Sequence, residues 1–371
     1  MDALMLPLNW QRVRLGDIAE INPPTIIPNV FYYIDLENVE KGQLLNKQLM
    51  TKNKAPSRAR RLLSKNDILY QLVRPYQRNN YFFTLNGNYV ASTGYAQIRT
   101  LQNPSFLYFA LHSNYFVNAV LDRCEGTSYP AINSNELKKC EVILPPLNEQ
   151  SAIANILSAL DRYLCALDAL ILKKEGVKKA LSFELLSQRK RLKGFNQAWQ
   201  RIRLGDIANY LTSNLSAEQI TQQGQIKVYD VNNFIGYTDT TFISDKPYIS
   251  IVKDGSVGRV RILPPKTNIL STMGALIANH KTTTEFLFYL LSNFDFKNFT
   301  SGSIIPHIYF KDYKEKTIFL PPLNEQSAIA NILSALDNEI ISLKNKKRQF
   351  ENIKKALNHD LMSAKIRVLE K

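Results

Sequence analysis

The stretch Leu144-Pro-Pro-Leu-Asn-Glu-Gln-Ser-Ala-Ile-Ala-Asn-Ile-Leu-Ser-Ala-Leu-Asp161 decides the fold, because the same 18 residues return unchanged at positions 320–337. The offset between the two copies is 176 residues in a chain of 371. A repeat of this length and sharpness predicts two copies of one structural unit. All further organisation is taken relative to these two stretches.

Each copy predicts the start of a long helix. Pro145 and Pro146 force an extended approach, Asn148 is a suitable N-cap, and Glu149 falls in the first turn, where the helix dipole favours negative charge. Apolar residues then alternate at spacings of four and three, which is typical of a heptad seam. The seam positions are Ile153, Leu157, Leu160, Leu164, Leu167 and Ile171 in the first copy, and Ile329, Leu333, Leu336, Ile340, Leu343, Phe350, Leu357 and Leu361 in the second.

The two helices are expected to pack on each other. Each pattern extends about 40 residues, to near Arg191 and near Arg367, which corresponds to roughly 60 Å of helix. Neither helix can bury its seam alone. An antiparallel pair is favoured, since a parallel pair requires the second globular body to span the whole helix length before the second helix begins.

A second repeat marks where each unit opens. The segment Trp10-Gln-Arg-Val-Arg-Leu-Gly-Asp-Ile-Ala-Glu20 returns as Trp199-Gln-Arg-Ile-Arg-Leu-Gly-Asp-Ile-Ala-Asn209 and predicts a short strand that enters a turn at Gly16-Asp17. The expected fold class is α+β, with two mixed α/β bodies joined by two long helices in an antiparallel coiled coil with internal pseudo-twofold symmetry. The predicted boundaries are 1–147 and 194–323 for the bodies, and 148–193 and 324–371 for the helices.

The composition indicates a partner with many negative charges. The net charge is +15, and a basic chain of this size usually meets a polyanion. A soluble basic protein from an AT-rich genome is the alternative, because Lys, Asn and Ile are plentiful. No apolar run of about 18 residues occurs, the first eight residues lack signal-peptide features, and the three cysteines show no CxxC spacing. We therefore expect a cytoplasmic protein with reduced thiols.

The two bodies are predicted to share a fold. In the first body, residues 67–73 and 89–98 alternate as strands do, and residues 106–112 follow a helix start at Asn103. Three segments have counterparts: 106–112 with 286–292, Ser92-Thr93 with Ser271-Thr272, and 126–132 with 302–308. The exposed residues of the two bodies differ, which is the pattern expected of two readers of different targets.

The motifs do not indicate an enzyme. Asn22-Pro-Pro-Thr25 resembles the tetrad of adenine N6-methyltransferases, but Thr25 replaces the aromatic residue that stacks on the base, and no Gly-rich S-adenosylmethionine loop accompanies it. We predict a turn after a short helix there. No phosphate-binding GxxxxGK[ST] loop occurs, and the four histidines lack metal-ligand spacing. No catalytic residue and no metal site are therefore predicted.

The remaining candidates are residues that bind nucleic acid. Arg can hold guanine in a fork, Asn and Gln can hold adenine, and Lys and Ser mostly hold phosphates. Any one of these side chains alone also fits a solvated surface, so the clustering carries the prediction. The candidates are Lys54, Arg58, Arg60, Arg61, Arg74, Tyr76, Gln77, Arg78, Asn79, Ser92, Thr93 and Tyr129 in the first body, and Lys253, Ser256, Arg259, Arg261, Thr272, Ser303 and His307 in the second.

With its paired Leu-Pro-Pro-Leu-Asn-Glu-Gln helix starts, paired Arg-Leu-Gly-Asp-Ile-Ala segments and body-helix-body-helix order, the chain resembles the DNA specificity (S) subunit of type I restriction-modification systems. The resemblance implies two target recognition domains that read an asymmetric, bipartite double-stranded DNA target with a fixed unread gap. It also implies two methyltransferase (modification) subunits docked on the helices and restriction subunits in the full complex. S-adenosylmethionine, Mg²⁺ and ATP are then expected on the partner subunits only, and the chain itself carries no cofactor.

The docking residues follow from the same resemblance. They are expected on the repeated helices, at Asn148, Glu149, Gln150, Leu157, Leu164, Asn324, Glu325, Gln326, Leu333 and Ile340. Two other classes of protein fit part of the pattern. A stand-alone DNA-binding regulator shares the charge and the bodies, and a helical scaffold protein shares the coiled coil.

Overall fold

The computed structural model describes residues 6–368 and divides into two compact units. Unit 1 runs to Asp168 and also contains the chain from Lys346 onward, whereas unit 2 is Ala169–Asn345. Each unit therefore combines one globular body with parts of both long helices. The predicted lack of a signal peptide concerns residues 1–8, of which residues 1–5 lie outside the described part. Within residues 6–368, no helix has both the length and the apolar character that crossing a bilayer requires.

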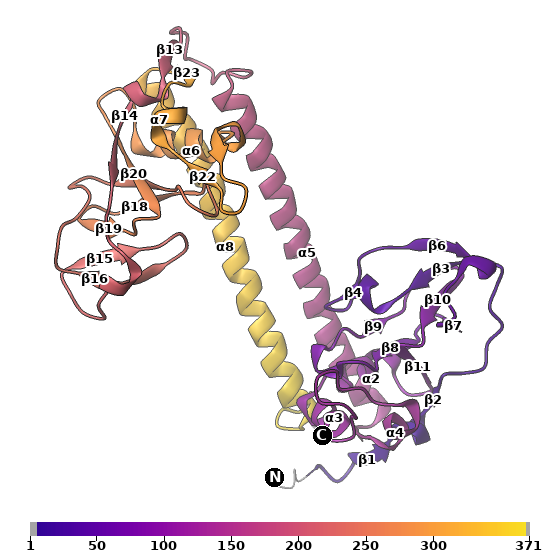
Figure 1. Cartoon of the computed structure of the whole chain (residues 1–371). Helices are drawn as coiled ribbons and strands as arrows, with labels where there is room; N and C mark the ends of the chain where they lie inside the picture. Colours follow the sequence, from indigo (N-terminus) through magenta and orange to yellow (C-terminus); the bar gives the residue numbers. More distant parts are fainter. Residues whose placement is uncertain (1–5, 369–371) are drawn as a thin grey trace. The chain divides into compact units, whose positions relative to one another are not determined.

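Unit 1 contains two four-stranded sheets, in the orders β6-β3-β10-β7 and β2-β11-β8-β9, and the two-stranded pairs β1-β12 and β4-β5 (Figure 1). Its strands are β1 (Gln11–Arg14), β2 (Ala19–Ile21), β3 (Val30–Ile34), β4 (Val39–Glu40), β5 (Gln43–Leu44), β6 (Gln48–Thr51), β7 (Ala59–Leu62), β8 (Ile68–Gln71), β9 (Tyr81–Phe82), β10 (Tyr89–Ser92), β11 (Tyr95–Thr100) and β12 (Glu141–Leu144). Its short helices are α1 (Leu15–Ile18), α2 (Pro104–Ala110), α3 (Asn114–Leu121) and α4 (Ser134–Lys139).

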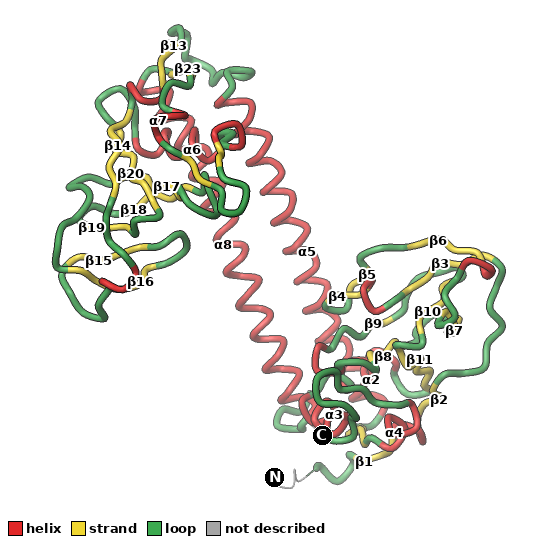
Figure 2. The backbone as a smooth tube through the Cα atoms, in the orientation of Figure 1, coloured by secondary structure: helices red, strands yellow, loops and turns green. Residues whose placement is uncertain are grey.

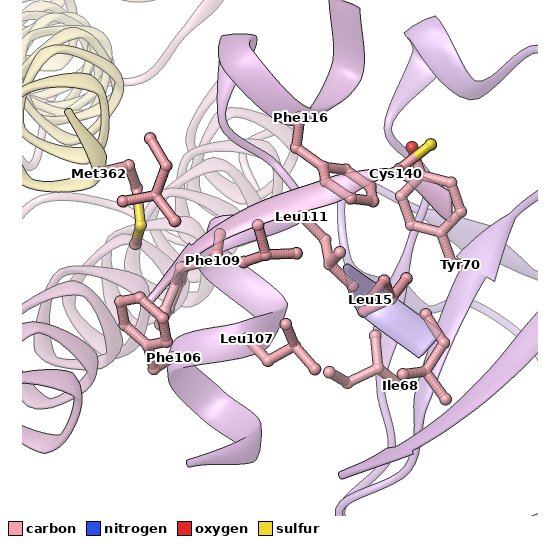
Figure 3. Close-up of a cluster of buried hydrophobic side chains, with 14 of the residues drawn as sticks. Leu15, Ile68, Tyr70, Phe106, Leu107, Phe109, Leu111, Phe116, Cys140 and Met362 are labelled. Carbon is pink, nitrogen blue, oxygen red and sulfur yellow. The ribbon is translucent and has the colours of Figure 1, made fainter. Parts of the chain in front are cut away.

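The largest core of unit 1 joins its sheets and short helices to the end of the chain. Figure 3 shows Leu15, Ile68 and Tyr70 beside Phe106 and other side chains of α2 and α3, with Met362 on the same cluster. Burial of this apolar surface contributes roughly 25 cal/mol per Å² and is what fixes α2 against the sheet. The C-terminal segment is therefore an internal part of unit 1.

Unit 2 repeats the plan with fewer strands. It has one four-stranded sheet, β14-β20-β17-β18, one three-stranded sheet, β16-β15-β19, and the pairs β13-β23 and β21-β22. Its strands are β13 (Gln200–Arg203), β14 (Ala208–Thr212), β15 (Ile226–Tyr229), β16 (Phe234–Thr238), β17 (Tyr248–Val252), β18 (Val260–Leu263), β19 (Thr267–Ile269), β20 (Met273–Ala278), β21 (Thr300–Ser301), β22 (His307–Ile308) and β23 (Thr317–Leu320). Its short helices are α6 (Thr284–Ser292) and α7 (Phe310–Tyr313).

The strand pairing confirms that the two bodies share a fold. The parallel pair β3-β10, with β6 antiparallel on β3, matches the parallel pair β15-β19, with β16 antiparallel on β15. The counterpart of β7 is missing, because in the described chain the sheet of β15 ends at β19. Unit 2 thus lacks the strand that carries Arg60 and Arg61 in unit 1.

Two uninterrupted helices of 40 residues, α5 (Leu147–Leu186) and α8 (Leu323–Met362), follow the repeated stretches (Figure 2). Their direction is antiparallel within each unit. In unit 1, Asp168 pairs with Lys347 at 2.6 Å while the earlier residue Asp161 pairs with the later Lys354. In unit 2, Lys174 pairs with Glu339 at 2.7 Å and Lys178 with Asp337 at 2.5 Å. The parallel alternative is wrong in both units, because the partner numbers fall as the α5 numbers rise.

The seam residues are buried or partly buried, as the four-three spacing predicts. Ile153, Leu157, Leu167 and Ile171 of α5 are buried, and so are Ile329, Leu333, Ile340 and Leu361 of α8. The first turns of each seam also belong to the cores of the globular bodies. Across the seam in unit 1, the rings of Tyr163 and Phe350 lie 4.7 Å apart. Several lysines of the two helices pair with acidic residues of the other helix, so part of the positive charge of the helices is neutralised within the chain.

The helix ends differ from the prediction by a few residues. Asn148 is not the N-cap, since α5 already begins at Leu147 and Asn148 lies in its first turn. The helix ends at Leu186 rather than near Arg191, because Gln188, at φ 62°, breaks the helical path before Gly194, whose residue type is the most common one after a helix end. In α8 the equivalent left-handed residue is Ala364, and Lys365 N–H donates to Asp360 O at 2.9 Å, which closes a Schellman-type end.

Candidate nucleic-acid interface

A row of backbone hydrogen bonds holds four loops of unit 1 side by side. Thr93 N–H donates to Arg58 O (2.8 Å), Leu72 N–H donates to Gly94 O (3.0 Å), and Arg74 N–H donates to Pro130 O (2.7 Å). The loops are segments 56–60, 72–80, 93–94 and 125–131, which we call the unit 1 loop set. Each loop follows or precedes a buried strand, so the sheets fix where the exposed side chains stand.

Unit 2 builds the same frame from its own segments. Lys253 N–H donates to Thr272 O (3.1 Å), and Gly255 N–H donates to Pro306 O (2.9 Å). Segments 253–259, 271–272 and 302–308 form the unit 2 loop set. The bond pattern confirms that 126–132 corresponds to 302–308. The predicted match of Ser92-Thr93 with Ser271-Thr272 is wrong by one residue: Thr272 O takes the place of Gly94 O, so Ser271 matches Thr93.

One group of the predicted residues in unit 1 is exposed on segment 52–61. Lys54, Arg58 and Arg60 are exposed, although Arg58 pairs with Asp35 at 2.7 Å and Arg60 Nε donates to Ser57 O at 2.7 Å. Arg61 is half-buried; burial lowers the pKa of its guanidinium, and its Nε has no hydrogen-bond partner among the described residues. Segment 52–61 therefore presents cations that are only partly neutralised within the chain.

Arg60 and Arg61 line a cavity of about 450 Å³, whose lining also includes Lys52, Phe31 and the tetrad that begins at Asn22. Asn22 follows strand β2 rather than a helix, and its side chain is engaged in the fold. Its Oδ1 accepts from Gln97 N–H at 2.9 Å and its Nδ2 donates to Ser134 Oγ at 2.8 Å. The tetrad therefore works as a wall of the cavity.

A second group in unit 1 lies on segment 74–79 and its neighbour loop. The Arg74 guanidinium lies 4.1 Å from the centroid of the Tyr129 ring, whose residue is 63% exposed. Tyr76 and Gln77 are exposed as well, and Gln77 Oε1 accepts from Gln71 Nε2 at 2.9 Å. Prediction from the sequence placed these residues in one cluster, and the bond between Arg74 N and Pro130 O brings the two segments together.

Three predicted contacts in unit 1 point into the protein. Ser92 is buried, and its Oγ accepts from Gly94 N–H at 3.2 Å. The guanidinium of Arg78 donates to His112 O (2.9 Å) and to Asn114 Oδ1 (2.7 Å), and burial lowers its pKa. Asn79 Oδ1 accepts from Lys41 N–H at 3.2 Å. Ser92, Arg78 and Asn79 thus each make a hydrogen bond that shapes its own loop, and their contact with DNA stays a prediction.

In unit 2 the exposed predicted residues are Ser256, Arg259, Thr272 and Ser303. Lys253 is mostly buried and contributes its backbone to the loop frame. His307 Nδ1 lies 2.7 Å from Asp254 Oδ1, which ties two loops together. Arg261 donates from Nη1 to Asn232 O at 2.9 Å and lies over the Tyr229 ring. His307 and Arg261 therefore have partners within the protein, in addition to any contact with a ligand.

The unit 2 loop set has an apolar tip that was not predicted from the sequence. Ile304 is 92% exposed, and Ile305 is also exposed. Ile305 stands where unit 1 has Tyr129, as the matched Gly-x-x-x-Pro segments could have indicated. Exposed isoleucines at this position offer a different contact surface from an aromatic ring stacked on a cation.

The Glu-Gln pair of each repeat supports the helix from inside. Trp10 Nε1 donates to Glu149 Oε2 at 3.0 Å, and Arg367 donates to both oxygens of Glu149 at 2.6 and 2.9 Å. In unit 2, Trp199 and Arg191 contact Glu325 in the same way, at 3.0 Å and at 3.2 and 2.6 Å. Both carboxylates are buried, so each needs these charge-assisted partners.

The glutamines fasten the short helices of the bodies. Gln150 Oε1 accepts from Asn103 N–H at 3.1 Å, and Gln326 Oε1 accepts from Thr283 N–H at 3.0 Å. Asn103 and Thr283 are the N-caps of α2 and α6. Glu149, Gln150, Leu157, Glu325, Gln326, Leu333 and Ile340 are all buried and Leu164 is partly buried, so their side chains stabilise the units rather than form an open docking face. Asn148 and Asn324 are exposed.

The family model for the type I restriction modification DNA specificity domain matches residues 7–174 and 196–352. The chain belongs to this family, which accounts for both units, and it is a type I restriction-modification DNA specificity subunit. Among relatives in Methanocaldococcus jannaschii, a protein assigned as the MjaX specificity subunit is 30% identical over 263 residues, covering 64% of this chain and 62% of that protein. The MjaVIII specificity subunit of the same organism is 23% identical and covers 99% of this chain and 95% of its own length.

The fold is also that of a solved structure. The type I restriction-modification S subunit of Mycoplasma genitalium superposes with a TM-score of 0.65 at 20% identity, and the match covers 96% of this chain and 98% of that one. At this level of identity the likeness concerns the fold, with its two bodies and long helices. Residue roles come from the geometry of this chain.

Proposed function

We propose that each unit of this specificity subunit reads one half of an asymmetric, bipartite double-stranded DNA target with an unread gap of fixed length. The observation that carries the proposal is the pair of loop sets, which share one backbone frame and differ in their exposed side chains. The frame bond is Arg74 N–H to Pro130 O in unit 1 and Gly255 N–H to Pro306 O in unit 2. Equal frames with unequal side chains suit two readers of unequal sequences.

The repeated helix starts support docking of two methyltransferase subunits. Several residues that are identical in both copies are exposed and take no part in the cores: Leu147, Asn148, Asn155, Ile156 and Ala159, with Leu323, Asn324, Asn331, Ile332 and Ala335 as their equivalents. Internal packing does not require exposed residues to match. Two surfaces that bind the same partner do require matching exposed residues. We therefore propose the same partner on both copies.

Within this proposal the chain is the non-catalytic part of the assembly. S-adenosylmethionine is assigned to the methyltransferase subunits, and Mg²⁺ and ATP to the restriction subunits that join for cleavage. The net charge of +15 favours association with DNA and gives it a steep dependence on salt. Neither helix-supporting carboxylate is free for chemistry, because Glu149 and Glu325 are both saturated by Trp and Arg donors.

The test is a map of methylated bases in cells that contain the chain and its modification subunit, with and without one matched heptad in each helix. Residues 169–175 and 345–351 are equivalent under the offset of 176, so removing both preserves the antiparallel register. We expect a split motif whose spacer shortens while both half-sites stay unchanged. An altered half-site with an unchanged spacer contradicts the proposal, and so does a single undivided motif for the unmodified chain.

The competing classes separate in the same preparation. A stand-alone regulator binds its full site tightly without the modification subunit. A helical scaffold protein binds DNA without the steep salt slope. The purified chain alone and the chain with its modification subunit are each titrated against a duplex that carries the mapped motif, at two salt concentrations. Together these titrations distinguish the specificity subunit, the stand-alone regulator and the scaffold protein.

A further inference from the structure

Arg74 occupies a backbone conformation that an L-residue adopts at a cost. Its φ and ψ are 54° and 55°, in the left-handed region, and its counterpart in unit 2 is Gly255 at φ +83°. Both residues make the same backbone hydrogen bond, so the loop has this shape with or without an arginine. A non-glycine residue there costs about 1–2 kcal/mol. The shape of the loop therefore does not require an arginine at this position, and the reason for the arginine lies in its side chain.

The side chain is held in place and its terminal donors are left unused. The guanidinium is stacked over Tyr129 at 4.1 Å, and Nε is buried against this contact. Among the described residues, no carboxylate pairs with it and no acceptor takes its two terminal nitrogens. Arg58 differs, because it pairs with Asp35 at 2.7 Å. Arg74 is thus a positioned, planar fork of donors in the unit 1 loop set, and the residue is partly exposed.

The neighbours of Arg74 turn inward and anchor the loop. Arg78 donates to His112 O and Asn114 Oδ1, and Gln77 accepts from Gln71. The backbone of Arg78 is also left-handed, at φ 55°. Two strained residues in one five-residue loop cost free energy that a functional contact offsets. The inward partners of Arg78 explain one of them, and the terminal donors of Arg74 remain to be matched by a ligand.

From this geometry we propose that Arg74 reads a guanine in the half-site bound by unit 1, with Tyr129 as the residue that positions it. The inference rests on the proposed function. Guanine offers two acceptors, O6 and N7, along one edge in the major groove, which match two parallel N–H donors; adenine places a donor beside its acceptor. A ring that fixes the guanidinium plane favours a planar base edge, and the shorter, point-charged ammonium of lysine supplies neither the fork nor the stack.

The central variant is Arg74→Gly, because Gly255 shows that the loop accepts glycine. It relieves the backbone strain, so the thermal midpoint of the chain stays the same or rises. In the methylation map we expect one position of one half-site to lose its guanine preference about tenfold or more, while the other half-site stays unchanged. Arg74→Lys is expected to behave in the same way. Tyr129→Leu relaxes the same position to a smaller degree, and Tyr129→Phe, which keeps the ring face, retains it.

The outcomes are separable. If the complex that contains the Arg74→Gly variant methylates the same motif at an unchanged or uniformly lower rate, Arg74 binds phosphate or makes no DNA contact. The inference is then overturned, while the proposed function of two half-site readers stands. If the position that relaxes is not a guanine, the base assignment is wrong. If the unmodified chain yields no split motif, the proposed function fails and this inference falls with it.

Discussion

Unit 1 and unit 2 are alike in the buried hydrogen bonds that support their helix starts and unlike in their exposed loop sets. The Trp-Glu hydrogen bond measures 3.0 Å in both, and both glutamates receive a forked arginine from the segment that follows the other long helix. The loop sets share backbone bonds but carry Arg74 and Tyr129 in one unit and Gly255 and Ile305 in the other. Polar groups inside a protein cannot vary singly without leaving a partner unsatisfied, whereas loop tips can.

The sheets differ in a further way that bears on DNA affinity. Unit 1 carries strand β7 with Arg60 and Arg61 beside a cavity, and in the described chain the corresponding sheet of unit 2 stops one strand short. Under the proposed function, the two units bring different numbers of cations to the backbone of DNA and favour different bases. Duplication supplied one scaffold, and edge strands and loops supplied the difference.

The largest expected effect tests whether the buried supports are equivalent. Glu149→Ala and Glu325→Ala should each lower the free energy of unfolding of their own unit by about 2 kcal/mol, because a buried indole N–H and a partly exposed arginine lose their acceptor. Trp10 and Trp199, the two tryptophans of the chain, report the two units separately by fluorescence in denaturant titrations. Gln at either position keeps one acceptor and serves as the milder control. If only one of the two alanine substitutions destabilises its unit, the two buried supports are not equivalent.

The stability of unit 1 should depend on pH through a histidine just after α2, and unit 2 has no equivalent histidine. Burial lowers the pKa of His112 to about 4. His112 Nδ1 lies 2.7 Å from Tyr108 O and Nε2 lies 3.3 Å from Asn80 Nδ2, contacts that suit the neutral ring. Unit 2 has Ser292 at the matching position.

Above pH about 6.5 the ring is neutral in both the folded and the unfolded chain, so it adds no pH dependence. Between pH 6.5 and 4 only the unfolded chain binds the proton, so the stability of unit 1 falls as the pH is lowered, by about 1–2 kcal/mol at pH 5. Denaturant midpoints followed at Trp10 at pH 7.5 and 5.0 measure this loss. His112→Gln, which keeps a donor and an acceptor but does not titrate there, should flatten it; an unchanged pH dependence in that variant assigns the effect to other groups.

The smallest expected effect concerns the middle of the helices. Gly176 lies in α5 on an exposed face, and an added Cβ would meet no atom within 4 Å. Gly176→Ala should therefore raise the free energy of unfolding by about 0.5–1 kcal/mol, since glycine is the costlier helix residue. Asn352, its equivalent in α8, is the matched control, and Asn352→Ala should gain less. A destabilised Gly176→Ala protein would show that the glycine serves a local bend.

The sequence contained the architecture because repeats and heptad spacing are long-range patterns. An 18-residue identity and a seam from Ile153 to Ile171 are insensitive to small errors, so the two units and the antiparallel direction follow from them. The helix ends and the directions of single side chains are not encoded this way. Nothing in the order of residues shows that Gln188 breaks α5 before Gly194 does, or that Arg78 turns toward His112 while Arg74 lies on Tyr129. Such outcomes depend on left-handed backbone positions that non-glycine residues reach only when tertiary contacts hold them.

The same limit applies to the Glu-Gln pair. Its repetition marked it as important, and exposure was the natural assumption for a charged residue near a helix start. The matching donors, Trp10 and Arg367 for Glu149, lie 139 and 218 residues away in sequence. A buried carboxylate is recognised only when such distant donors are seen around it.

The core of unit 1 contains Leu361 and Met362, and its buried Glu149 is neutralised by Arg367. During synthesis, the first body to leave the ribosome therefore lacks part of its interior until residues 361–367 have been added. Unit 2 is in the opposite position, because its own share of the two helices ends at Asn345. The domain made first is completed last, and a message cut short before codon 361 yields a chain whose later half can close while its earlier half exposes an unfinished apolar surface to chaperones and proteases.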